Sequence, residues 1–253
     1  NLGIFNPPDI LELNFYCDTY GIDSISFATM TAFVMECYEA GILNRERTGG
    51  LELHFGNADA MLEILHQIAA NEGFGPTVGL GVRQMKGIFA EKYGADPQFL
   101  QDIGMECKGL EYSEYVSKES IAQQGGYGMA NKGPQHDEAW LIFMDAINKQ
   151  IPTFEDKAEA LHYFPMFRTW FGLNGLCKLP WNDVEPADNK KKHPPRVAAR
   201  VPEHVDNYIR LFRAVTGRTD VNEPEDLIRM SEPAYNLQRL FNLRMGFGTR
   251  EHD

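Results

Sequence analysis

The sequence predicts a mainly α fold, on three observations. Apolar residues recur at spacings of three and four along most of the chain, which is the period of a helix packed on one face. Residues that cap helices stand before many of these segments, and glycines stand after them. Alternating apolar and polar patterns are scarce, and the best strand candidate is Leu51–Phe55.

Helical segments dominate the first hundred residues. Asn6 can cap the first helix, and Pro7 suits its first position because proline needs no amide hydrogen bond there. Glycine suits the left-handed conformation in which helices commonly end. The expected helices run from Pro7 to Gly21, from Asp23 or Ser24 to Gly41, from Asn57 to Gly73, and up to Tyr93.

The composition changes in the middle of the chain. Residues 94–133 are rich in glycine and short polar stretches, which is typical of a loop or domain junction. We therefore expect a first domain over residues 1–105 and a second over residues 106–253. Residues 180–202 contain several prolines and are expected to form a surface loop. The later helices are expected at His136–Lys149, Thr153–Phe171, Pro202–Thr216 and Glu223–Leu243.

Charge and composition exclude several functions. The 36 acidic residues outnumber the 24 basic ones, giving a formal charge of -12 that repels nucleic acid and anionic membranes. The sequence contains no apolar run of the roughly 20 residues that cross a bilayer, and no export signal is recognisable. The four cysteines are widely scattered, so we expect reduced thiols in a cytoplasmic protein. The chain begins without methionine and reads as an excerpt from a longer protein.

The segment Asp18-Thr19-Tyr20-Gly21-Ile22-Asp23 has two interpretations. Gly21 suits a helix end and Asp23 a helix cap, so a plain helix–turn–helix accounts for both residues. The same geometry leaves free backbone N–H groups at the start of the second helix. The carboxylates of Asp18 and Asp23 can then accept hydrogen bonds from a ligand. Spacing alone favours the plain turn and allows the ligand site.

Two cysteines stand beside turns of this kind. Cys177 follows Gly175, and it is either an inert core thiol or a thiolate that reaches an iron atom. A [4Fe–4S] cluster needs four ligands, so three would have to come from outside this chain. Cys17 precedes Asp18 and can ligate a soft metal such as tungsten, but it also falls on an apolar helix stripe with Leu13.

His136 lies in the segment Asn131-Lys132-Gly133-Pro134-Gln135-His136-Asp137-Glu138. It is either a surface histidine in the acidic first turn of a helix or a proton donor or acceptor. The other histidines show no metal-ligand spacing, so a zinc site is not expected. The sequence also contains no phosphate-binding loop, dinucleotide fingerprint or nucleophile elbow.

Six segments in the same order resemble the C-terminal helical part of the aldehyde ferredoxin oxidoreductase family, which includes the tungsten-dependent benzoyl-CoA reductases. The resemblance covers nearly the whole chain. Residues 18–26 follow the family pattern Asp-x-x-Gly-Leu-Asp-x-x-Ser, with Ile22 in place of leucine. The other segments are Asn1–Gly3, Gly56–Ala60, Asn131–His136, Gly175–Cys177 and Asn236–Asn242.

This resemblance implies two helical domains that correspond to domains 2 and 3 of the family fold. They would close over a β-rich N-terminal domain of the same parent protein. The implied cofactors are a tungsten or molybdenum bis-pterin and a [4Fe–4S] cluster. The implied cofactor contacts are Asp18, Gly21, Ile22, Asp23, Lys132, Gly133 and Leu176. Cys177 would ligate the cluster and His136 would stand near the metal as proton donor.

The implied reaction is oxidation of an aldehyde to an acid, with electrons passing to ferredoxin or another electron-transfer subunit, or reduction of an aromatic acyl-CoA such as benzoyl-CoA. The segment alone would be inactive. Three departures from the family pattern bear on the substrate: Gly172 replaces an aspartate, Lys132 an arginine and Glu138 a lysine. The family's Asp-Pro-Arg segment is also not recognisable between Tyr112 and Gly126. The alternative function is a non-catalytic helical binding or assembly domain derived from this family.

Overall fold

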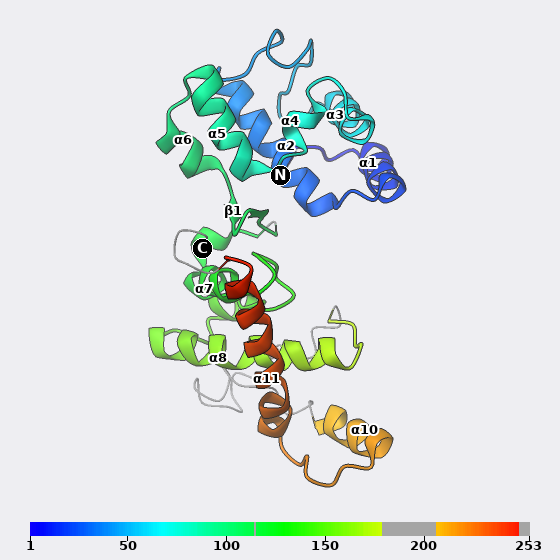
Figure 1. The fold of residues 1–253 in the computed structure, drawn as a ribbon, viewed down its shortest axis with the longest axis vertical. Coiled ribbons are helices and arrows are strands. Elements are labelled where there is room, and N and C mark those ends of the chain that lie inside the picture. The colour runs from blue at the N-terminus through cyan, green and yellow to red at the C-terminus, as the bar shows by residue number, and fades with distance from the viewer. Residues whose placement is uncertain (114, 179–205, 248–253) are drawn as a thin grey trace. The chain divides into compact units, whose positions relative to one another are not determined.

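The computed structural model describes residues 1–113, 115–178 and 206–247, and these residues are mainly helical (Figure 1). The predicted fold class is therefore confirmed. The chain divides into two compact units, Asn1–Glu114 and Tyr115–Asp253. The expected boundary at residue 105 lies before this division because a short hairpin, residues 106–111, packs on helices of the first unit.

The first unit contains six helices and one hairpin among its described residues. The first three helices begin at the predicted caps, with Asn6, Asp23 and Asn57 at the N-cap positions. The expected fourth helix is divided in two, because Gly81 adopts a φ of +87° between its parts. The elements are α1 Pro7–Tyr20, α2 Ser24–Glu39, α3 Ala58–Ala70, α4 Gly75–Val78, α5 Val82–Tyr93, α6 Pro97–Ile103, β1 Glu106–Cys107 and β2 Leu110–Glu111.

The predicted strand at residues 51–55 is wrong. The only described strands are β1 and β2, which pair antiparallel. Side chains, not a neighbouring strand, form hydrogen bonds with two carbonyls of this segment. The Leu51 carbonyl accepts from Thr48 Oγ1 at 2.7 Å, and the Glu52 carbonyl accepts from Asn57 Nδ2 at 2.7 Å. A segment held in this way needs no sheet.

Residues 94–133, expected to be a loop or a domain junction, contain the division between the two units, but they are not a continuous loop because they also contain α6 and α7 (Ile121–Met129). Asp96 caps α6 by accepting the amide of Gln98 at 3.0 Å, and Pro97 occupies the first helical turn. Ser120 caps α7 by accepting the amide of Gln123 at 3.1 Å. Glycines inside α7 weakened its sequence signal, since glycine is a poor helix former.

The core of the first unit centres on α2, whose buried residues include Phe33, Val34 and Cys37. The rings of Phe33 and Phe89 stack with centroids 5.9 Å apart, which joins α2 to α5. From α3, Met61, Ile64 and Leu65 complete this core.

The second unit is built around α8 (Phe154–Leu173), which packs against both α7 and α11 (Pro224–Arg244); Figure 1 shows α11 crossing α8. Both long helices begin one residue after the predicted starts, because Thr153 and Glu223 occupy the N-cap positions. The remaining described elements are the 3₁₀ turn η1 Ser117–Glu119, the π-helical turn η2 Phe143–Ile147 and the helix α10 Asp206–Thr216.

The predicted helix at His136–Lys149 is wrong. Within these residues only Ile142 and the η2 turn that follows it are helical. The buried side chain of Gln123 takes the hydrogen bonds that a helix would use. Its Oε1 accepts the amides of Leu141 and Ile142 at 2.8 and 3.0 Å, and its Nε2 donates to the Ala139 carbonyl at 2.7 Å. This pairing holds the segment in an irregular conformation.

An aromatic cluster joins α8 to the C-terminal helices. Phe167 and Trp170 stack with centroids 6.2 Å apart, and Trp170 meets Tyr208 and Phe212 of α10 at 6.0 and 5.9 Å. The expected loop at residues 180–202, and the expected helix start at Pro202, lie outside the described residues, which resume at Asp206 in α10.

Candidate functional site

The first predicted turn lies between α1 and α2. Gly21 adopts the left-handed conformation with φ +69°, and the Ile22 amide donates to the Cys17 carbonyl at 2.9 Å. Asp23 caps α2 by accepting the amide of Ser26 at 2.8 Å. The side chains of Asp18 and Asp23 are exposed and Ile22 is half-buried. The turn thus forms a helix–turn–helix and presents two carboxylates to the surface.

A hydrogen bond holds the end of α1 against α3. Tyr20, inside the predicted turn, has its hydroxyl 2.8 Å from His66 Nδ1. The ring of Tyr16 meets the His66 ring edge-on at 4.7 Å and stacks on Tyr20 at 5.6 Å. These contacts limit the movement of the segment that carries Asp18.

Cys17 is buried at 2% exposure and lines a cavity of about 220 Å³ with Leu13 and Phe27. Burial, and then the charges of Asp18 and Asp23, raise the pKa of its thiol. A metal ligand must be a thiolate, whereas this environment favours the neutral thiol. The role of Cys17 as a tungsten ligand therefore stays a prediction, and such a metal would have to supply the charge that deprotonates the thiol.

The second predicted turn follows α8. Gly175 adopts φ +65°, and the Leu176 amide donates to the Phe171 carbonyl at 2.9 Å, which ends the helix. Cys177 is a free and exposed cysteine, and Leu176 is 38% exposed. Gly172 lies in the last turn of α8, where an added Cβ would meet no described atom within 4 Å. Packing against the described residues therefore does not exclude an aspartate at position 172.

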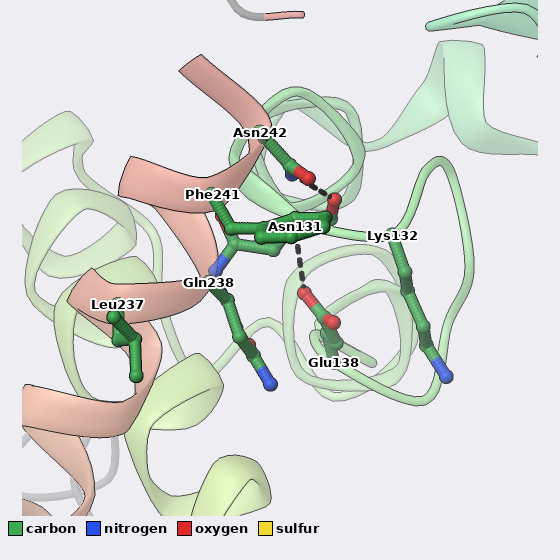
Figure 2. Close-up of a pocket in the computed structure, with 7 residues that line it drawn as sticks. All are labelled: Asn131, Lys132, Glu138, Leu237, Gln238, Phe241 and Asn242. Carbon is green, nitrogen blue, oxygen red and sulfur yellow. Dashed lines mark hydrogen bonds between the residues drawn. The ribbon is translucent and has the colours of Figure 1, made fainter. Parts of the chain in front are cut away.

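The segment Asn131–Glu138, here called the His136 segment, is clamped to α11 by Asn131 (Figure 2). Asn242 Nδ2 donates to the Asn131 carbonyl at 2.5 Å, and Asn131 Nδ2 donates to the Tyr235 carbonyl at 3.2 Å. The Asn131 amide donates to Glu138 Oε2 at 2.8 Å, which closes the segment on itself. Gly133 is buried with φ +114°, a conformation that favours glycine.

His136 is half-buried, with its ring edge-on to Tyr115 at a centroid distance of 5.2 Å. Burial lowers the pKa of its imidazole; Asp137 opposes this change, and Arg168 and Lys132 add to it. The imidazole is therefore uncharged at neutral pH and suited first to accepting a proton.

Asp137 joins the His136 segment to the second turn. Its carboxylate forms ion pairs with Lys132 and, at 3.4 Å, with Lys178, the residue after Cys177. Its backbone carbonyl accepts from Arg168 Nη1 at 3.4 Å. Burial works against ionisation of Asp137, but the two lysines outweigh it and lower its pKa. The structure thus brings Lys132 and Lys178 together at Asp137. Asp137 follows His136 in the chain, and Lys178 follows Cys177.

Sequence reasoning missed Asp137 and Arg168 as organising residues. Arg168 is 1% exposed although it is fully charged in proteins. Its position between Phe167 and Trp170 on the apolar side of α8 was a usable signal, because a buried charge requires partners. Asp137 was passed over as one of two acids beside the histidine.

The first predicted turn lies in the first unit, and the second predicted turn lies in the second unit. Among residues 1–113, 115–178 and 206–247, no group of three or more His, Cys, Asp or Glu side chains could hold a metal ion. No helix in the same ranges is both long enough and apolar enough to span a membrane. Any cluster bound through Cys177 therefore needs ligands beyond the described residues.

The described residues thus form a mainly helical protein with exposed carboxylates on one glycine turn and an exposed thiol on another. Comparison with known families identifies the class to which such a chain belongs. Residues 1–253 match the family model for aldehyde ferredoxin oxidoreductase, domains 2 & 3, and the chain belongs to this family.

Two relatives from the genus Pyrococcus match the whole chain. The tungsten-containing aldehyde ferredoxin oxidoreductases of Pyrococcus abyssi and Pyrococcus furiosus are 26% and 27% identical over 100% of this chain. The chain spans 38% of the length of each. An aliphatic sulfonate oxidoreductase, WOR-like subunit, of Pyrococcus furiosus is 32% identical over 50% of this chain and 21% of its own length.

Proposed function

We propose that this chain is the C-terminal part of a cytoplasmic oxidoreductase that oxidises aldehydes to carboxylic acids and passes the electrons to ferredoxin or a similar electron-transfer subunit. The family match and the names of the full-length relatives support this reaction. The observation that carries the proposal is the exposed thiol of Cys177, whose neighbour Lys178 is tied through Asp137 to the His136 segment.

The proposed cofactors are a tungsten or molybdenum bis-pterin and a [4Fe–4S] cluster, held jointly with the rest of the parent protein. The exposed carboxylates of Asp18 and Asp23 fit the N–H groups of a pterin, and Gly21 and Ile22 form the turn between them. The exposed Cys177 fits a cluster ligand, with Leu176 beside it. Lys132 and Gly133 belong to the same cofactor region through the Asp137 ion pairs.

When bound, the metal pterin supplies the two-electron oxidation, and the cluster carries electrons away one at a time. The overall reaction takes RCHO and H₂O to RCOOH, two protons and two electrons. The uncharged imidazole of His136 would accept one of these protons, because its lowered pKa keeps it available as a base at neutral pH.

The similarity to aldehyde ferredoxin oxidoreductases favours aldehydes over benzoyl-CoA as substrates. The half-chain match to a sulfonate oxidoreductase subunit gives a reason to include a sulfonate among the test substrates. Substrate choice is therefore part of the experiment.

The experiment uses the full-length protein, purified without oxygen from cells supplied with tungstate. Tungsten, molybdenum, pterin and iron are measured first. Reduction of ferredoxin is then followed with acetaldehyde, benzaldehyde and an alkylsulfonate, and oxidation of reduced ferredoxin is followed with benzoyl-CoA. We expect metal, pterin and iron, and activity with the aldehydes. Protein that folds but contains none of these would instead support the non-catalytic assembly domain.

Two cysteine variants sharpen this test. Cys177→Ser should lower the iron content and abolish the cluster signal in electron paramagnetic resonance. Cys37→Ala is the matched control, because burial raises the pKa of the Cys37 thiol to about 12 and it belongs to the α2 core. An unchanged cluster signal in Cys177→Ser would remove this residue from the proposed site.

A further inference from the structure

The sequence contains a single Asn-Gly pair, Asn174-Gly175, which follows the last residue of α8. Both residues are exposed, and they belong to an uninterrupted exposed run, residues 172–177, that ends at Cys177. Asparagine is chemically labile because its side-chain carbonyl carbon lies within reach of the next backbone nitrogen. When the next residue is glycine, no Cβ hinders the approach of that nitrogen.

We propose that Asn174 is a site of spontaneous deamidation through a cyclic imide. The amide nitrogen of Gly175 attacks Cγ of Asn174 and forms a new N–Cγ bond. The bond from Cγ to the side-chain nitrogen breaks, and that nitrogen leaves as ammonia with the proton of the Gly175 amide. Water then opens the ring: breaking the new N–Cγ bond gives aspartate, and breaking the original peptide bond gives isoaspartate. The sum is asparagine plus water to aspartate or isoaspartate plus ammonia, without an oxidant or a metal.

Two hydrogen bonds hold the reacting groups in the folded turn. Asn174 Nδ2 donates to the Trp170 carbonyl at 2.8 Å, and the Gly175 amide donates to the Gly172 carbonyl at 3.2 Å. Asn174 has φ -101° and ψ 7°. The attack requires rotation about ψ of Asn174, and this rotation breaks the hydrogen bond of the Gly175 amide. Opening of this turn therefore controls the rate of the reaction.

The surroundings of the turn offer little resistance to this opening. An added Cβ at Gly172 or Gly175 would meet no described atom within 4 Å, so neither glycine is packed tightly against another element. The side chains of Leu173 and Leu176 are 58% and 38% exposed. Helix ends with few buried contacts open locally without unfolding of the protein. The turn can thus reach the reactive conformation while Phe171 stays in the core of the second unit.

Asn71 provides a comparison within the same protein. It is also exposed, and it also occupies the C-cap position of a helix, that of α3, with φ 58° and ψ 45°. The residue after it is Glu72, whose Cβ hinders the attacking nitrogen. The two asparagines thus share exposure and position at a helix end, but only Asn174 precedes a glycine.

Either product changes the turn that carries Cys177. An aspartate carboxylate cannot donate to the Trp170 carbonyl, so the hydrogen bond of the Asn174 side chain is lost. Isoaspartate routes the main chain through Cβ and Cγ, which adds an atom between the buried Phe171 and the ion-paired Lys178. The position of Cys177 between these two anchors must then change. An effect on a bound cluster rests on the proposed function, whereas the modification itself does not.

The test follows both asparagines in the full-length protein, held at pH 8 for several days. Samples are digested by a protease at mildly acidic pH, and mass spectrometry measures the fraction in which OH has replaced NH₂. Electron-transfer fragmentation separates aspartate from isoaspartate. We expect Asn174 to react at least about tenfold faster than Asn71 and to give both products. Equal rates at the two positions, or aspartate without isoaspartate, would overturn the proposal.

Two variants identify the attacking nitrogen. Gly175→Asn adds a Cβ at a position with φ +65°, a conformation that asparagine tolerates better than most residues. It should slow the reaction at Asn174 at least about tenfold. Gly172→Asn is the matched control, because it adds the same side chain beside the turn without altering the attacking residue, and it should change the rate less than about threefold. Equal rates in the two variants would refute attack by the Gly175 amide.

The modification requires neither a cofactor nor a substrate, so the two proposals fail separately. Protein that deamidates at Asn174 as described but contains no tungsten, molybdenum or iron would support this site and refute the proposed redox function. Active, metal-loaded protein in which Asn174 reacts no faster than Asn71 would do the reverse.

Discussion

Gln123→Leu should release the backbone that follows the His136 segment. The Gln123 side chain is fully buried and makes three hydrogen bonds, to the Ala139 carbonyl and to the amides of Leu141 and Ile142. Leucine has a similar size but no polar atoms, so the substitution leaves three buried backbone groups without these partners. The conformation of residues 139–142 therefore depends on this amide side chain.

The expected cost follows from those three groups. Each buried group without a partner costs about 1–2 kcal/mol, and a well-packed leucine recovers about 1–2 kcal/mol. The net loss in local stability is about 2–4 kcal/mol, which corresponds to roughly 30- to 1,000-fold faster amide exchange because 1.4 kcal/mol is tenfold. Hydrogen exchange with mass spectrometry on the full-length protein, read in peptides covering residues 136–142, measures this change.

Gln124→Leu is the matched control. Gln124 is the next residue of α7, is exposed, and makes one bond through Nε2 to the Ser117 carbonyl at 3.0 Å. It should change exchange at residues 136–142 less than threefold. If Gln123→Leu gave an equally small change, the reasoning that one buried amide holds this segment would be refuted.

Three further predictions concern the same unit. Asp137→Asn should lower the free energy of unfolding at pH 7 and remove the part of it that depends on acid. Because the pKa of Asp137 is lowered in the folded protein, its carboxylate stabilises the fold at pH values above the ordinary pKa of about 3.9. This stabilisation is lost as the pH falls through the pKa of the folded state. Acid titration of urea unfolding checks it, and parallel profiles for both proteins would contradict it. Gly126→Ala should destabilise α7, because the added Cβ would lie 2.7 Å from the Cβ of Ala139. In Gly128→Ala the added Cβ meets no described atom within 4 Å, so this variant should stabilise the helix by about 0.5–1 kcal/mol. Thermal melts in which both variants shift the melting temperature in the same direction would be inconsistent with this packing. Gly172→Asp should raise the pterin retained by the full-length protein, with Gly172→Asn as the neutral control, and unchanged retention would show that this position does not contact the cofactor.

Capping residues and apolar periodicity predicted the helices whose ends are set by hydrogen bonds between residues close in sequence. Asn57 and Thr153 begin helices because their side chains accept amides three residues ahead, a pattern visible in the sequence. Gly21 and Gly175 likewise end helices in the left-handed conformation. These interactions span few residues, so no knowledge of the fold was needed.

The errors arose where side chains compete for backbone hydrogen bonds. The segment after His136 has helical spacing, but Gln123, from α7, accepts the amides of Leu141 and Ile142. A local pattern cannot reveal such a competitor, because its position depends on the packing of another element. At the expected strand the competitors are close in sequence, because Thr48 and Asn57 donate to the carbonyls of Leu51 and Glu52.

The candidate site divides in the same way. The sequence identified the turns at Gly21 and Gly175 and the segment with His136, but their environments came from the fold. The burial of Cys17 depends on the packing of α1, and the ion pairs of Asp137 depend on the end of α8. Neither could be derived from spacing in the sequence.

The side chains around Asp137 form a group, partly buried, with an excess of positive charge. Lys132 and Lys178 share one carboxylate, and Arg168 donates to a carbonyl of the same residue, so the cations outnumber the anion that they surround. Positive charge near a redox centre makes the addition of an electron more favourable. A cluster bound at Cys177 would therefore retain an electron more readily here than beside a balanced surface, and replacing Lys178 with a neutral residue would lower its reduction potential.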